Sequence, residues 1–303
     1  MELSINISNL FPRYDFGKCI DIYKEAGFTA CDYSLTGLVN DADRWNGDNY
    51  RELAEEVRRI SDEKGFPITQ THAPFTFKAA QWDDPVIFEE VTFPRMVRSL
   101  EISGIIGAKV EVIHPIHHTL YKGHEEELFE RNMAYYRRLI PYAKEYGVKI
   151  GVENMFQVDP RRKHIVADVC SNLEEFIRYI DTLDSDQITA CLDVGHVGLP
   201  LTDMEAADVI RGLGHDRLGS LHIHDNDYKN DQHVLPYLGI INWMEVGKAL
   251  GEIDYKGDFT YEVKGNLLCN CDEGFVPAMA AFYAAPGKHI CAEIERNRPG
   301  KNA

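Results

Sequence analysis

Short apolar segments alternate with longer amphipathic ones eight times along the 303 residues of this chain. The short segments are the predicted strands, at Leu3–Ile7, Ala30–Ser34, Ile68–His72, Lys109–His114, Lys149–Glu153, Ile188–Asp193, Gly219–His222 and Phe259–Val263. The predicted helices span about 14–24, 48–64, 86–106, 125–146, 172–184, 203–213, 243–251 and 273–285. Strands that alternate with helices pair in parallel, and right-handed crossovers close eight of them into a ring. The pattern therefore predicts an α/β fold, a single-domain (β/α)8 barrel over residues 1–303, with a C-terminal helical extension at about 273–303.

Residues at the helix boundaries support this division. Four predicted helices are followed by glycines, which suit a left-handed C-cap: Gly27, Gly65, Gly107 and Gly147. Ser171-Asn-Leu-Glu174 has the spacing of a capping box at a helix start. An open doubly wound sheet is the alternative, but it usually carries a Gly-rich phosphate loop after its first strand. The segment NISNLFPRYDFG lacks such a loop, so the barrel is favoured.

Charge and cysteine content narrow the class of protein. The formal net charge of -17 repels phosphate backbones and anionic membranes, which disfavours nucleic acid as a partner. No segment reaches the roughly 18 apolar residues of a membrane span. The N-terminal residues do not have the pattern of a signal peptide. Seven scattered cysteines with no CxxC pair fit a reducing compartment, so we expect a cytoplasmic protein.

Six consecutive predicted strands end in histidine, aspartate or glutamate. These residues are His72, His114, Glu153 with Asn154, Asp193 with His196, His222 with His224, and Glu262. Asp231 and His233 follow in the loop after the seventh strand. Because the carboxyl ends of the strands of a parallel barrel converge on one face, we expect these side chains to lie together.

A single histidine or carboxylate at a strand end usually only caps a helix or makes a hydrogen bond, but a whole ring of them needs another explanation. Each carboxylate buried without a counter-charge costs several kcal/mol. At five of the six strand ends there is no arginine or lysine, and Lys264 is the exception. A divalent cation would neutralise the group, and mixed imidazole and carboxylate ligands suit Zn²⁺, Mn²⁺, Co²⁺ or Fe²⁺. The sequence therefore predicts a metal site.

The motifs THAP, VIHP, GVEN, LDVGH, LHIHD with the following DQH, and YEV resemble the xylose isomerase-like barrel superfamily, over about residues 3–285. That superfamily includes sugar phosphate isomerase/epimerases, ketose 3-epimerases and the endonuclease IV type of nuclease. The resemblance implies one divalent ion, Mn²⁺ or Zn²⁺, held by Glu153, Asp193, His222 and Glu262. The residues of a three-metal nuclease site are matched as well, by His72 and His114 with Glu153, and by His196, Asp231 and His233.

The same resemblance implies an isomerase or epimerase acting on a small carbohydrate. Glu153 and Glu262 would be the catalytic acid/base pair, removing and returning a proton beside a carbonyl group. His196, Asn154 and Lys264 would bind the substrate.

Alternative activities remain open on the same residues. Ketose 3-epimerases carry an arginine shortly after the His-x-x-Asp motif, and none occurs here between Asp225 and Asp231. A carbohydrate lyase or dehydratase is therefore an alternative. A metal-dependent nuclease (phosphodiesterase) is another, but the loops GLVNDADRWNGDNY and KAAQWDDPVIFEE are acidic or mixed, whereas DNA binding needs basic loops.

The remaining expectations concern loops and assembly. His117, His118 and His124 are predicted surface-loop residues, and Trp45, Phe75, Phe77 and Trp82 are predicted to pack in lids rather than contact a ligand. The stretch from Pro286 to the end is a candidate contact for a homo-oligomer.

Overall fold

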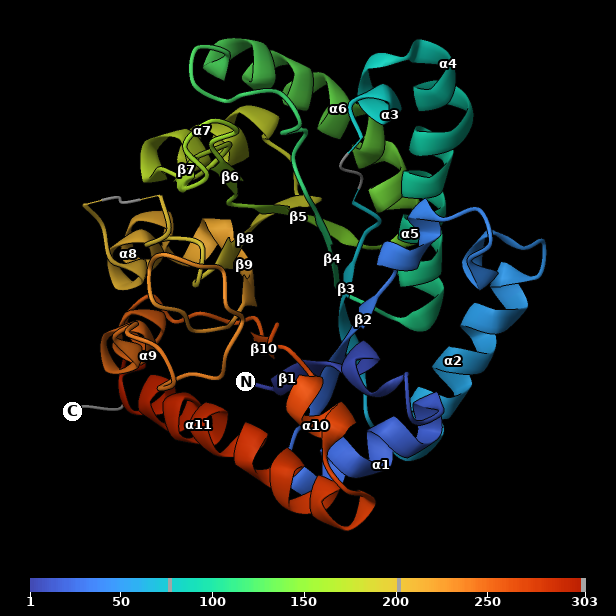
Figure 1. The fold of residues 1–303 in the computed structure, drawn as a ribbon, viewed down its shortest axis with the longest axis vertical. Coiled ribbons are helices and arrows are strands. Elements are labelled where there is room, and N and C mark those ends of the chain that lie inside the picture. The colour runs from blue at the N-terminus through green and yellow to red at the C-terminus, as the bar shows by residue number, and fades with distance from the viewer. Residues whose placement is uncertain (76–77, 201–202, 301–303) are drawn as a thin grey trace.

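The computed structural model of the chain describes residues 1–75, 78–200 and 203–300. Eight parallel strands form one sheet in the order β10-β1-β2-β3-β4-β5-β8-β9. Their bounds are β1 Leu3–Asn6, β2 Ala30–Ser34, β3 Ile68–His72, β4 Val110–Ile113, β5 Lys149–Glu153, β8 Ile188–Asp193, β9 Leu218–His222 and β10 Phe259–Tyr261. The two edge strands meet through one parallel bridge, in which the Ile223 amide donates to the Thr260 carbonyl at 2.9 Å. The bridge nearly closes the sheet into a TIM barrel, and the predicted fold is confirmed (Figure 1).

Eight longer helices surround the barrel. They are α1 Phe16–Ala26, α2 Tyr50–Lys64, α5 Phe93–Ile106, α6 Glu125–Tyr146, α7 Leu173–Leu183, α8 Ala206–Arg217, α9 Trp243–Glu252 and α11 Val276–Arg296. The last of them, α11, packs against both α1 and α9, so the C-terminal helical segment completes the outer ring beside the first strand (Figure 1). No helix in the described ranges is both long and apolar enough to span a membrane.

The helix boundaries confirm one prediction and correct another. Each of the four glycines closes its helix with a positive φ, from 56° at Gly65 to 98° at Gly27. The capping box predicted at Ser171–Glu174 is wrong. The N-cap of α7 is Asn172, whose side chain accepts the Glu175 amide, while the Ser171 hydroxyl accepts the Asp168 amide. The chain is extended at Asn172, so its side chain is the one that reaches the first turn.

The pleat of the strands decides which residues reach the mouth of the barrel. A Cβ at Gly151 of β5 would touch Cys191 of β8 and Ser220 of β9, so these three positions face the barrel interior. Side chains two residues further along a strand point to the same side. Glu153, Asp193 and His222 stand two residues after these three positions, and they therefore project inward at the carboxyl ends of their strands.

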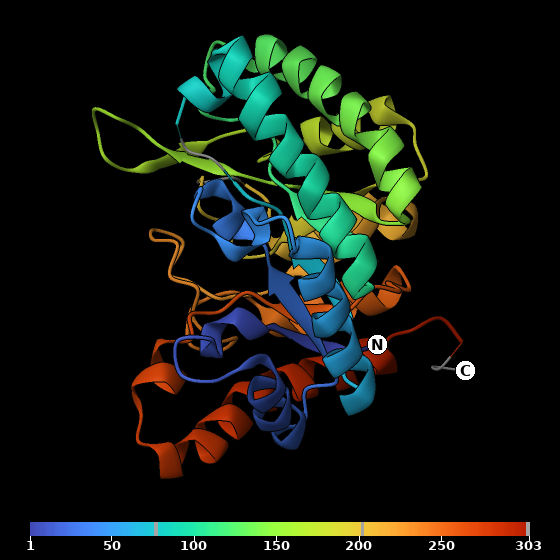
Figure 2. The same ribbon diagram turned by 90° about the vertical axis from the view of Figure 1, so that its right-hand side faces the viewer.

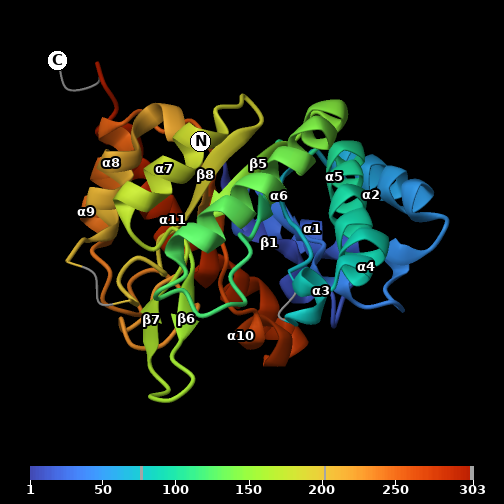
Figure 3. The ribbon, with the colours of Figure 1, turned by 90° about the horizontal axis from the view of Figure 1, so that it is seen from above.

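Two connections rise above this end of the barrel. The antiparallel hairpin of β6 (Phe156–Val158) and β7 (Ile165–Ala167) follows β5 and projects beyond the other elements (Figures 2 and 3). The long segment between β9 and α9 is held by the buried Asp225 carboxylate, which accepts hydrogen bonds from Trp243 Nε1 at 2.7 Å and the Tyr237 amide at 2.9 Å. Shorter helical turns are η1 Ile7–Leu10, η2 Thr36–Val39, η3 Arg44–Asn46, α3 Ala80–Asp83, α4 Pro85–Ile87, the π-helical turn Phe88–Thr92, α10 Asn266–Asn270 and η5 Glu273–Phe275.

Candidate metal centre and active-site cavity

Four of the residues singled out in the sequence meet at the centre of the barrel mouth, and we call them the central cluster. Each of the four offers one potential ligand atom, and these atoms all lie within 4.8 Å of one another; the residues are Glu153, Asp193, His222 and Glu262. The His222 Nδ1 atom is 3.0 Å from Glu153 Oε1 and 3.5 Å from Glu262 Oε2. Glu153, Asp193 and His222 are buried, whereas Glu262, just after β10, keeps a quarter of its side chain exposed (25%).

The chemistry of this donor set fits a divalent cation. Three carboxylates share a buried space with one imidazole, and within the described ranges no lysine or arginine forms an ion pair with any of them. Asp193 Oδ2 is buried without a hydrogen-bond partner among the described residues. Burial alone raises the pKa of Glu153, but His222 and His114 outweigh it and hold that pKa well below its usual value. Such ionised carboxylates with an imidazole are ligands that Zn²⁺ and Mn²⁺ accept.

A second group, the His72 group, lies on the β3 and β4 side and comprises His72, His114 and Glu153. His72 Nε2 and His114 Nε2 are 3.1 Å apart, and His114 Nε2 is 3.0 Å from Glu153 Oε2. The other ring nitrogen of His72, Nδ1, donates to the Ala73 carbonyl at 2.8 Å. Burial, together with the neighbouring His114, lowers the pKa of His72 to about 4. A neutral imidazole whose second nitrogen is fixed by the backbone has the form that a metal ligand needs.

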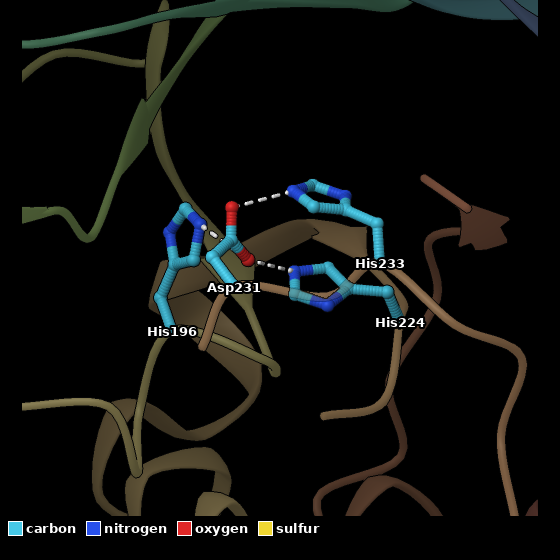
Figure 4. A group of neighbouring side chains, drawn as sticks. All are labelled: His196, His224, Asp231 and His233. Atoms are coloured by element: carbon cyan, nitrogen blue, oxygen red, sulfur yellow. Dashed lines mark hydrogen bonds and ion pairs between the residues drawn. The ribbon is translucent and has the colours of Figure 1, made fainter. Parts of the chain in front are cut away.

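A third group, the His233 cluster, comprises His196, His224, Asp231 and His233 (Figure 4). Asp231 stands between the imidazoles, with Oδ2 2.8 Å from His233 Nε2 and Oδ1 3.6 Å from His224 Nε2. His224 Nε2 is also 3.0 Å from Asp193 Oδ1, so this histidine links the third group to the central cluster. Its side chain shares the inward face with His222 because the chain stays extended for two residues beyond β9, through the bridge at Ile223.

The three residues predicted to bind substrate occupy different positions. The His196 ring lines the cavity, and its Nδ1 atom donates to the Asn154 carbonyl at 2.8 Å. The Asn154 side chain is buried and makes two hydrogen bonds to the Asp193 backbone, so it ties β5 to β8. Lys264 is exposed and is not among the residues that line the cavity.

Members of all three clusters line the floor of a cavity of about 640 Å³, which is in the size range of small-molecule sites. They are His72, His114, Glu153, His196, Asp231, His233 and Glu262. The cavity walls combine imidazoles with apolar side chains: Phe75, His117, His118, Leu120, Met155, Phe156, Gln157, Val158 and Pro160. Phe75 stacks on His114 at a centroid distance of 4.8 Å.

Several loop residues differ from their predicted roles. His117 and His118, expected on the surface, line the cavity, and Phe75, expected in lid packing, does so as well. Their position directly after the strand-end motifs THAP and VIHP was the available signal. His124 is outside the cavity, and its Nδ1 atom bonds the Leu120 carbonyl. Phe77 lies outside the described residues.

Known proteins share both the sequence pattern and the fold. The chain is 27% identical over 249 residues to D-psicose 3-epimerase of Enterocloster bolteae, a match that covers 80% of this chain and 75% of the epimerase. It is also 27% identical over 197 residues to the uncharacterized protein MJ1311 of Methanocaldococcus jannaschii, a match that covers 64% of this chain and only 63% of that relative.

Among solved structures, the zinc-bound IOLI protein superposes with a TM-score of 0.72 at 16% identity, covering 99% of this chain and 100% of that one. The family model described as xylose isomerase-like TIM barrel matches residues 20–281, which is most of the sequence. Because this match spans well over half of the sequence, the chain belongs to the xylose isomerase-like TIM barrel family.

Proposed function

We propose that this chain is a divalent-metal-dependent isomerase or epimerase that moves a carbon-bound proton beside the carbonyl group of a sugar or sugar derivative. The observation that carries the proposal is the central cluster, whose ligand atoms lie within 4.8 Å of one another and whose two glutamates, Glu153 and Glu262, line the cavity. The relationship to a D-psicose 3-epimerase and the fold shared with a zinc-bound protein support it. Zn²⁺ or Mn²⁺, held by Glu153, Asp193, His222 and Glu262, would polarise the carbonyl and stabilise the charge that develops beside it.

The two glutamates of the cluster would transfer the proton. Glu153 comes from β5 and Glu262 follows β10, so they approach the floor of the cavity from different parts of the barrel wall. One carboxylate removes the proton from the carbon next to the carbonyl, and the other returns a proton on the opposite face. His196 and the cavity walls would orient the sugar above them. The His72 group and the His233 cluster could bind further ions, and we propose that the central cluster binds the one required for the reaction.

A nuclease would need basic side chains around the same floor. None of the described residues that line the cavity is a lysine or an arginine, and the chain carries a net charge of -17. Contact with a phosphodiester backbone depends on such cations, so this lining favours an uncharged sugar over nucleic acid.

The direct test is solvent-proton exchange. The protein, loaded with Mn²⁺ or Zn²⁺ after metal analysis, is incubated in D₂O with a panel of ketoses and aldoses, and deuterium at the carbon next to the carbonyl is followed by NMR. We expect exchange in the wild type and a loss of ~10²-fold or more in Glu153→Gln. Glu127→Gln, at an exposed site on α6, is the matched control. No exchange with any substrate at full metal occupancy would refute the proposal, and an abasic-site duplex incised by the same preparation would favour the nuclease.

A further inference from the structure

An imidazole on the cavity wall is oriented by a buried carboxylate that belongs to none of the three clusters. His117 lies three residues after His114, and the centroids of the two rings are 6.0 Å apart. Its Nδ1 atom is 2.8 Å from Oδ2 of Asp168, a fully buried residue directly after β7. The second Asp168 oxygen accepts the Val169 amide at 2.8 Å. An ionised carboxylate only accepts hydrogen bonds, so Nδ1 carries a proton in both the neutral and the charged form of His117, and Nε2 is the nitrogen that can exchange a proton with a ligand.

The loop that carries this histidine is fixed in place by Gln157 of β6. The Gln157 side-chain nitrogen donates to the carbonyls of His117 and Thr119 at 3.0 and 2.7 Å, and its oxygen accepts the Tyr121 amide at 3.0 Å. Three hydrogen bonds from one side chain hold the imidazole in position before a substrate arrives. Such fixed geometry is what proton transfer in an active site needs.

The neighbouring histidine shows that this arrangement is particular to His117. His118 lines the same cavity, but its Nε2 atom bonds Asp83 at 3.0 Å, and Asp83 is half exposed and also pairs with Arg131. For His117, no described residue forms a hydrogen bond with Nε2, and the ring borders the cavity. The buried carboxylate thus holds one side of the imidazole, and the other side faces the cavity. Hydrolase triads have the same arrangement, in which the carboxylate orients the catalytic histidine.

The dyad stands one ring away from the central cluster, because the His117 ring contacts the His114 ring and His114 Nε2 is 3.0 Å from Glu153 Oε2. A sugar carries an oxygen on almost every carbon. With the carbonyl and the neighbouring hydroxyl above the central cluster, the next oxygen along the chain is attached to the carbon β to the carbonyl. We infer that His117, held by Asp168, is the acid that protonates this β-oxygen, so that the site catalyses β-elimination from a sugar ketone or aldehyde. The inference rests on the proton abstraction proposed above.

The step balances within the residues named. A carboxylate of the central cluster removes the proton α to the carbonyl, and the released electron pair forms the α,β double bond. The bond between the β-carbon and its oxygen breaks, and the Nε2–H of protonated His117 supplies the proton that the departing oxygen takes. The products are an α,β-unsaturated carbonyl compound and water, or an alcohol when the oxygen carries a substituent. Solvent then removes the proton from the carboxyl group and returns one to His117.

The experiment compares two leaving groups of different basicity on one sugar ketone. With methoxide the oxygen needs a proton in order to leave, whereas p-nitrophenoxide leaves without one. In the metal-loaded protein we expect His117→Gln and Asp168→Asn to slow methanol release by ~10²-fold or more and p-nitrophenol release by less than about tenfold. Exchange of the α-proton in D₂O should fall by less than about tenfold in both variants, because His117 also borders the sugar but does not take part in that step. Imidazole should restore methanol release in His117→Ala. His124→Gln, on the same loop but outside the cavity, is the matched control.

The outcomes separate this inference from the function on which it rests. If the wild type exchanges the α-proton but releases neither leaving group, the elimination is refuted and the proposed function stands. If both leaving groups and the α-exchange fall together in the variants, His117 and Asp168 have a structural role and the inference is wrong. If the wild type exchanges no proton, both proposals fail.

Discussion

Glu111 of β4 makes the stability of this barrel depend on pH, independently of any catalytic role. Its carboxyl group is fully buried, and neither oxygen has a hydrogen-bond partner among the described residues. The nearest hydroxyls are engaged elsewhere, because Ser99 bonds the Met96 carbonyl and Ser103 bonds Thr71. Burial raises the pKa of Glu111 to about 8, although Ser99 and Ser103 act in the opposite direction.

The sign and size of the effect follow from the two protonation equilibria. Between the ordinary pKa of 4.5 and the folded pKa of about 8, the unfolded chain ionises at this residue and the folded chain does not. Rising pH in this window therefore favours unfolding, and above it both states are ionised and the penalty is constant. Linkage gives a loss of ~2 kcal/mol in the free energy of unfolding between pH 6 and pH 8.

Urea denaturation at several pH values between 5 and 9 measures this loss. The Glu111→Gln variant has nothing to ionise, so the difference between its free energy of unfolding and that of the wild type should grow by ~2 kcal/mol from pH 6 to pH 8. Glu127→Gln, exposed on α6, should run parallel to the wild type. Parallel curves for Glu111→Gln as well would mean that the carboxyl is solvated in solution, and would refute the reasoning.

Two further predictions concern the loops and the metal. Replacing Asp225 by Ala removes the acceptor of Trp243 Nε1 and of the Tyr237 amide, so we expect a loss of ~3 kcal/mol in the free energy of unfolding, measured with urea; a variant as stable as the wild type would contradict the role given to this carboxylate. Treatment with EDTA should lower the Tm by several degrees, because an ion at 100 times its Kd stabilises the folded state by ~2.7 kcal/mol, and added Zn²⁺ or Mn²⁺ should restore it. Asp193→Asn should be insensitive to both treatments, and an EDTA effect of the same size in that variant would place the ion elsewhere.

Much of the fold was predictable because it depends on patterns of residues that are close in the sequence. The eight barrel strands and the glycine C-caps follow from hydrophobic periodicity and from the one residue type that tolerates a positive φ. The meeting of Glu153, Asp193 and His222 follows from the same pattern, since a strand end in a parallel barrel has only one face to reach. That these residues hold a metal is still a prediction.

What the sequence did not reveal depends on contacts between distant segments. The strands β6 and β7 have three residues each and no periodicity to mark them, and they exist because Phe156–Val158 pairs with Ile165–Ala167. The bond between His117 and Asp168 joins residues 51 positions apart, and no local motif links the one to the other. The error at Ser171 is of the same kind, because its hydroxyl is taken by the Asp168 amide of the preceding turn.

The β6–β7 hairpin pairs only with itself among the described strands and shares no ladder with the barrel. It brings Phe156, Gln157 and Val158 to the cavity wall and leads directly to Asp168. Evolution can therefore lengthen, shorten or rewrite this insertion without breaking a hydrogen bond of the barrel sheet. Relatives that keep the same strand-end residues but differ in the insertion should share the proposed proton abstraction beside the carbonyl. They should differ in the substituents that they accept on the sugar.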